Sequence, residues 1–113
     1  MSPEALDAAC RALPAVTHVV QWGGSDVYKV GGKVFAIAGL GGGLTFKATP
    51  MAYEILREMG RARRAPYLTS GNWLAIDGLE DLEEAEVADW LTTSHGLVSA
   101  KLTRLLRREL GLG

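Results

Sequence analysis

Two pairs of adjacent glycines, Gly23-Gly24 and Gly31-Gly32, divide a stretch of the chain that is rich in β-branched and aromatic residues. Glycine adopts the positive φ angles that tight hairpin turns need, and β-branched residues favour strands. The spacing therefore predicts successive antiparallel strands near residues 17–22, 26–30 and 33–38. Such a meander limits the fold to classes that contain a mainly antiparallel sheet.

Further turn signals extend this sheet. The glycine-rich run at 39–43 lacks the lysine and hydroxyl residue that follow a phosphate-binding loop, so it predicts a mobile hairpin loop. That loop leads to a fourth strand at 44–47, and a fifth strand is predicted at 73–76, before the Asp77-Gly78 turn. The sheet should therefore have about five strands.

Helix signals lie before, between and after these strands. Ser2-Pro3 predicts a helix that Pro14 ends, and Thr49-Pro50 predicts the start of a second. From residue 81 apolar residues recur at helical spacing, interrupted by Gly96, which predicts two helices or one helix kinked there. The fold class is thus α+β, with the sheet packed against helices. The periodicity assigns to the core Leu6, Leu13, Phe35, Ile37, Leu56, Ile76, Leu91 and Leu102.

Length, charge and cysteine content limit the class of protein. The 113 residues suit one domain over 1–113, and a net charge of −1 gives no strong overall attraction to phosphate or membranes. Cys10 is the only cysteine, which excludes an intramolecular disulfide and fits a reducing compartment. The sequence shows neither a secretion signal nor an apolar run of about 20 residues, so we expect a cytoplasmic protein without membrane contact.

No set of residues matches a catalytic or metal-binding pattern. Cys10 lies on the apolar side of the first predicted helix, where burial favours a structural thiol. Ser94 and His95 are neighbours on a helix and project about 100° apart, which hinders proton exchange between them. His18 lacks a cysteine or a suitably spaced histidine for zinc. We therefore expect no catalytic residues, no metal and no cofactor, and a protein that is not an enzyme.

Basic residues gather in two parts of the sequence. One group surrounds the end of the second helix and a predicted loop at 61–66, and the other lies near the C-terminus. The members are Arg57, Arg61, Arg63 and Arg64 in the first group and Lys101, Arg104, Arg107 and Arg108 in the second. Cations are favourable near helix C-termini, and this explains where both basic groups lie. It does not explain why the first group contains four arginines. A phosphate-binding patch therefore stays open as an alternative.

The three tryptophans are predicted to pack in the core. Trp22, Trp73 and Trp90 each fall at a strand or helix position with apolar neighbours. Trp73 also follows a polar stretch at 70–72, so an exposed ring available for stacking is an alternative for this residue.

A series of short motifs along the chain resembles the MmcQ/YjbR family. The motifs are Trp22-Gly23, Val30-Gly31-Gly32-Lys33-Val34-Phe35, Leu44-Thr45-Phe46-Lys47-Ala48-Thr49-Pro50, Asn72-Trp73 and Ser94-His95-Gly96-Leu97-Val98. Their order and separations make the resemblance specific over almost the whole chain. It implies an α+β fold of frataxin-like arrangement and a DNA-binding protein with a double-wing motif. The hairpins about Gly31-Gly32 and Gly41–Gly43 would be the wings, with Lys29, Lys33 and Lys47 offered to phosphates.

Two classes of function follow. The first is a protein that binds nucleic acid, expected to be duplex DNA with weak sequence preference, because lysine and arginine contact the backbone more often than bases. The expected site residues are Lys29, Lys33, Lys47, Arg61, Arg63, Arg64 and Trp73. The second is a non-catalytic module that binds a small molecule or a protein in a groove between sheet and helices. Salt-dependent DNA binding separates the two.

Overall fold

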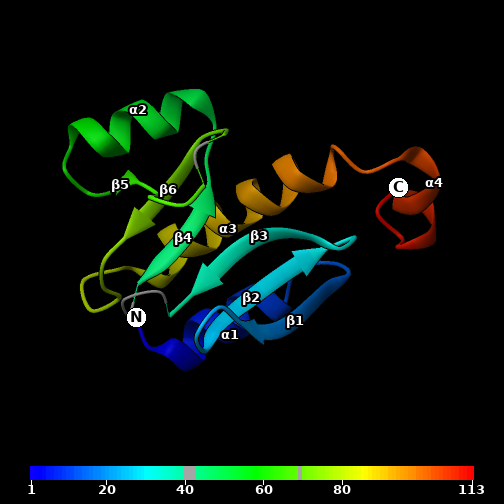
Figure 1. Cartoon of the computed structure of the whole chain (residues 1–113), viewed down its shortest axis with the longest axis horizontal. Helices are drawn as coiled ribbons and strands as arrows, with labels where there is room; N and C mark the ends of the chain where they lie inside the picture. The colour runs from blue at the N-terminus through cyan, green and yellow to red at the C-terminus, as the bar shows by residue number, and fades with distance from the viewer. Residues whose placement is uncertain (40–42, 69) are drawn as a thin grey trace.

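The computed structural model describes residues 1–39, 43–68 and 70–113 (Figure 1). The helices are α1 (Pro3–Arg11), α2 (Pro50–Glu58), α3 (Glu84–Ser99) and α4 (Arg104–Glu109). The strands are β1 (Val16–Gln21), β2 (Ser25–Val30), β3 (Lys33–Ala38), β4 (Leu44–Lys47), β5 (Arg63–Arg64) and β6 (Trp73–Ile76). This arrangement confirms the α+β fold class.

All six strands form one antiparallel sheet in the order β1-β2-β3-β4-β6-β5. The sequence predicts about five strands, and the additional one is β5, where a basic loop is expected. Arg63 pairs with Ala75 and Arg64 with Leu74 of β6. Two residues are too few to give a periodic signal in the sequence. The strand forms because its residues pair with the edge of β6.

The predicted helix starts are confirmed in atomic detail. The Ser2 hydroxyl accepts a hydrogen bond from the amide of Ala5, and Thr49 accepts one from Ala52. Proline occupies the first position of both helices, where its missing N–H costs nothing.

The C-terminal helical region divides at a different place from the one predicted. α3 runs through Gly96 to Ser99, and α4 begins after Thr103, whose hydroxyl accepts a hydrogen bond from the Leu106 amide. Gly96 stays helical because Leu91 and Val98, on either side of it, are both buried in the core. Packing therefore outweighs the low helix propensity of one glycine.

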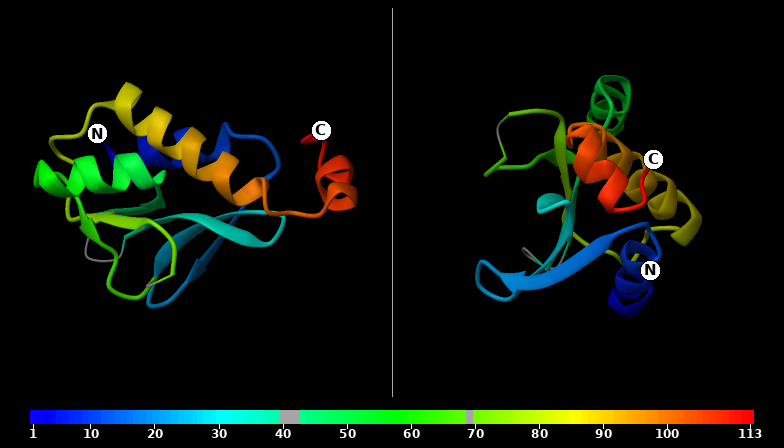
Figure 2. Two further views of the ribbon diagram at one scale, coloured as in Figure 1. Left: turned by 90° about the horizontal axis from the view of Figure 1, so that it is seen from above. Right: turned by 90° about the vertical axis from the view of Figure 1, so that its right-hand side faces the viewer.

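α1 and α3 lie on the same side of the sheet and cover one of its faces (Figure 2). The main core forms there, around Phe35, Phe46 and Leu74, and the Phe46 ring stacks on Trp90 of α3 with 5.2 Å between centroids. Of the predicted core residues, Ile37 is buried outside this cluster and Leu13 is only half-buried. The remaining six belong to the main core.

Trp22 is not a core residue, contrary to the prediction. Its side chain is 56% exposed and it sits in the turn between β1 and β2 with φ +49°. The apolar neighbours that suggested burial, Val19 and Val20, are themselves exposed on the edge strand β1. On an edge strand, apolar residues can face solvent. The sequence pattern of such a strand is the same as that of a buried strand, so it does not reveal the exposure.

The predicted hairpin loop at 39–43, and with it the second wing, falls mostly outside the described residues. At its base Ala38 pairs with Leu44, and the Gly39 amide donates to the Gly43 carbonyl at 3.2 Å. Within the described part of the chain, no helix has the length and apolar character needed to cross a membrane.

Candidate nucleic-acid interface

Lys47 and Trp73 face each other across two neighbouring strands. Lys47 ends β4, Trp73 begins β6, and the register pairs them directly. Side chains alternate along a strand, and Phe46 and Leu74 point into the core, so Lys47 and Trp73 belong to the face away from α3. The Lys47 ammonium lies 5.9 Å from the centre of the Trp73 ring, within the range of a cation–π contact.

A second lysine approaches this pair from the turn after α3. Hydrogen bonding to Lys101, burial and the charge of Lys101 together lower the pKa of Lys47. In the described part of the chain, neither lysine forms an ion pair with a carboxylate. Two amino groups held together without a counter-charge favour an anion between them.

The lysines of the β2–β3 hairpin lie on opposite faces of the sheet. Tyr28 and Val30 point into the core, so Lys29 between them is on the same face as Lys47. Lys33 pairs with Val30 and therefore belongs to the helix-covered side, where it is exposed at the hairpin end. Only one of the two hairpin lysines thus shares a face with Lys47.

Two of the predicted arginines already have carboxylate partners. Arg61 forms a two-point ion pair with Glu86, and its guanidinium lies 5.3 Å from the Trp90 ring. Arg63 donates from Nε and Nη2 to Asp77, at 3.0 and 2.7 Å. These hydrogen bonds lower the pKa of both carboxylates. Arg64 lies exposed on β5 opposite Leu74.

The structure therefore brings together only part of the expected site. Lys47 and Trp73 are in contact and Lys29 shares their face, whereas Arg61 and Arg63 are neutralised by residues 25 and 14 positions away in the sequence. Lys101 is the residue that the expected site omits. Its membership of the C-terminal basic group is the one sequence signal that could have found it.

The model of the YjbR family matches residues 11–97 of the chain. The chain belongs to the YjbR family. No curated protein matches it significantly in sequence. Its structure is similar to the crystal structure of Deinococcus radiodurans protein DR2400, which carries a DUF419 domain. The TM-score is 0.83 at 24% identity, over 96% of this chain and 86% of that one, so the two share a fold.

The serine of the YjbR motif in α3 holds two strands together. Ser94 is fully buried, its hydroxyl accepts from the Lys47 amide at 2.9 Å, and it donates to the Phe35 carbonyl at 2.6 Å. The pairing of β3 with β4 ends at Ala36 and Phe46, immediately before these groups. The hydroxyl thus takes the place of a backbone hydrogen bond where the strands separate.

Two other YjbR motif residues have structural roles. His95 contacts the Pro14 carbonyl through Nε2 at 2.8 Å and packs edge-on against Phe35, with 5.2 Å between ring centroids. Gly31 has φ +59°, and a Cβ atom there would lie 2.6 Å from Cδ1 of Leu102. Only glycine suits this turn without displacing Leu102.

Proposed function

We propose that this YjbR protein binds nucleic acid by its phosphate backbone, at the end of the sheet where Lys47, Lys101 and Trp73 meet. The observation that carries the proposal is the close approach of two lysines without an anionic partner among the described residues. A phosphate between their amino groups replaces repulsion by attraction on both sides. Lysine contacts of this kind position a nucleic acid without reading its sequence.

The neighbourhood of these lysines suits a polynucleotide better than an isolated phosphate ion. Trp73 offers part of an aromatic ring beside Lys47, and Lys29 extends the positive charge along the same face. Alternating cations and aromatic rings are typical of surfaces that follow a nucleic-acid strand, since bases stack on the rings. The net charge of −1 makes binding depend on this local patch.

The proposal assigns a smaller role to the arginines than the sequence suggests. Arg61 and Arg63 each direct their hydrogen-bond donors to a carboxylate, so a phosphate must displace Glu86 or Asp77 to reach them. The Arg63–Asp77 pair is exposed, and a pair of this kind contributes little stability. Lys47 and Lys101 require no such exchange.

Salt dependence of binding tests the proposal. Fluorescence anisotropy with a labelled duplex and a labelled single strand gives the slope of log affinity against log salt. We expect Lys47→Gln and Lys101→Gln each to reduce that slope, by about 0.9 on the duplex and about 0.7 on the single strand for each phosphate that the variant no longer neutralises. Lys33→Gln is the matched control, because it removes the same charge from the other side of the sheet.

Two results would overturn the proposal. One is that neither the duplex nor the single strand binds at low salt. The other is an equal reduction of the slope in Lys33→Gln and Lys47→Gln, which would indicate attraction by overall charge rather than by a site.

A further inference from the structure

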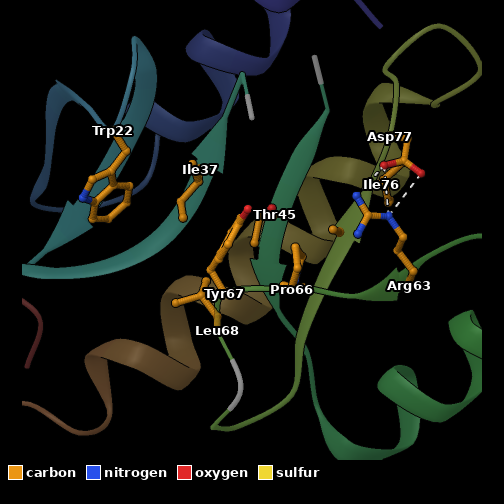
Figure 3. A pocket seen from close by; sticks show the side chains of 11 residues that line it. Trp22, Ile37, Thr45, Arg63, Pro66, Tyr67, Leu68, Ile76 and Asp77 are labelled. Atoms are coloured by element: carbon orange, nitrogen blue, oxygen red, sulfur yellow. Dashed lines mark hydrogen bonds and ion pairs between the residues drawn. The ribbon is translucent and has the colours of Figure 1, made fainter. Parts of the chain in front are cut away.

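The sheet face away from α3 carries a pocket of about 700 Å³ (Figure 3). Its floor is formed by Ile37, Thr45 and Ala75, from β3, β4 and β6. Trp22 lies on one side, in the β1–β2 turn, and 66–68, before β6, lie on the other. The volume is within the usual range for small-molecule sites. The ion pair of Arg63 and Asp77 also lines it.

Aromatic side chains form two sides of this pocket and are exposed to solvent. Trp22 is 56% exposed and Tyr67 is 85% exposed, which is unusual for rings of this size. Trp22 also has a left-handed backbone, at φ +49°, although glycines follow it at positions 23 and 24. A bulky residue in that region is strained by about 1–2 kcal/mol, and such strain gathers at functional sites.

The floor of the pocket contains a hydroxyl group that faces the pocket. Thr45 is only 6% exposed, and its side chain forms no hydrogen bond within the described residues. Ser94, which is comparably buried, has two hydrogen-bond partners. Thr45 lines the pocket, so its hydroxyl, which has no protein partner among the described residues, can exchange a hydrogen bond with a ligand there.

The pocket lies beside the lysine site on the same face of the sheet. Thr45 pairs with Ala75, and Lys47 pairs with Trp73, two residues farther along the same strands and on the same face. Two residues span about 7 Å along a strand. A nucleotide whose base occupies the pocket therefore has its phosphate within reach of Lys47.

We propose that the pocket binds an unpaired nucleobase. The base lies against Trp22 and Tyr67, and its edge exchanges a hydrogen bond with the Thr45 hydroxyl. Base pairing hides that edge in a duplex, so the base comes from a single strand or from a free nucleoside. Binding of a base within a single strand rests on the proposed function, because the phosphates of the strand contact Lys47 and Lys101. Binding of a free nucleoside does not depend on these lysines.

Three ligands separate these possibilities when titrated into the whole chain by fluorescence and NMR. The ligands are a single-stranded oligonucleotide, an abasic strand of the same length and free adenosine. We expect the oligonucleotide to bind about tenfold or more tightly than the abasic strand. Trp22→Gly and Tyr67→Ala should abolish that advantage and leave abasic affinity unchanged, whereas Lys101→Gln should weaken both strands alike.

Thr45→Val distinguishes a ligand site from a structural one. It keeps the shape and removes the hydroxyl that faces the pocket, so the variant should bind bases several-fold more weakly and melt at nearly the same temperature as the natural protein. A merely structural threonine would not change base affinity.

The remaining outcomes are also decisive. Equal affinity for both strands, with no response to adenosine, overturns the nucleobase proposal and leaves the phosphate site intact. Salt-dependent binding that is absent for both strands and for the labelled duplex, together with an adenosine shift of the Trp22 indole resonance, overturns the proposed function and supports a nucleoside pocket. No response to any of the three ligands or to the duplex removes both proposals.

Discussion

The amide of Lys47 and the carbonyl of Phe35 share one hydroxyl group, that of Ser94, at the point where β3 and β4 separate. A helix side chain thus completes the hydrogen bonding of two adjacent strands. The same residue fixes the backbone from which Lys47 extends toward Lys101, so the candidate site depends on α3 for its position.

Ser94→Ala should lower the free energy of unfolding strongly. It leaves a buried donor and a buried acceptor unpaired, and each unpaired group costs about 1–3 kcal/mol. Thr92→Ala is the control in the same helix, because its exposed hydroxyl bonds only to the Ala88 carbonyl and its removal should cost under about 0.5 kcal/mol. Urea denaturation measures both. Equal destabilisation of the two variants would contradict the bridging role.

Lys101→Gln should change how stability depends on pH. The folded state lowers the pKa of Lys47, so the unfolded state binds more protons and the natural protein gains stability as pH rises toward the ordinary lysine value of 10.5. The variant should lose this gain and be more stable at neutral pH. Comparing the two proteins removes the contributions of other groups, and an identical pH profile would exclude the Lys47–Lys101 interaction.

The turn between β2 and β3 depends on glycine at position 31, where a Cβ atom would meet Leu102. Gly31→Ala should destabilise more than Gly32→Ala by about 1 kcal/mol, because both positions have positive φ but only the first meets a side chain. Thermal denaturation of the two variants measures the difference. A Leu102→Ala background should reduce the difference if Leu102 is the obstacle, and an unchanged difference would exclude it.

Cys10 should be inert in the native protein. It is fully buried, and burial raises the pKa of its thiol to about 12, so almost no thiolate exists at neutral pH. Thiol reagents should modify it only as fast as the chain unfolds, and Cys10→Ala should cost roughly 1 kcal/mol without changing nucleic-acid binding. Rapid modification under native conditions would contradict this.

The elements of the fold follow from local signals, because the caps at Ser2 and Thr49 and the turn at Gly31-Gly32 act within a few residues. The formation of β5 and the end of α3 at Ser99 do not follow from local signals. Pairing with β6 determines the first, and packing against the sheet determines the second. The family is also apparent from the order of short motifs.

The candidate site is predictable only in part. Lys47 and Trp73 belong to motifs, but Lys101 joins them through the course of α3 across the sheet. Charge neutralisation of Arg61 by Glu86 is equally invisible in a sequence, since the partners are 25 residues apart. The exposure of Trp22 reverses an expectation drawn from its apolar neighbours.

The bridge made by Ser94 also bears on the order of folding. Ser94 lies 47 residues from Lys47 and 59 from Phe35 in the sequence. The hydrogen bonds at this end of the β3–β4 pair therefore form only after α3 packs against the sheet. Contacts between such distant positions form late, whereas the turns that join β2 to β3 and β3 to β4 are local. In stopped-flow experiments Ser94→Ala should therefore accelerate unfolding and leave the refolding rate nearly unchanged, and slower refolding would place α3 in the folding nucleus.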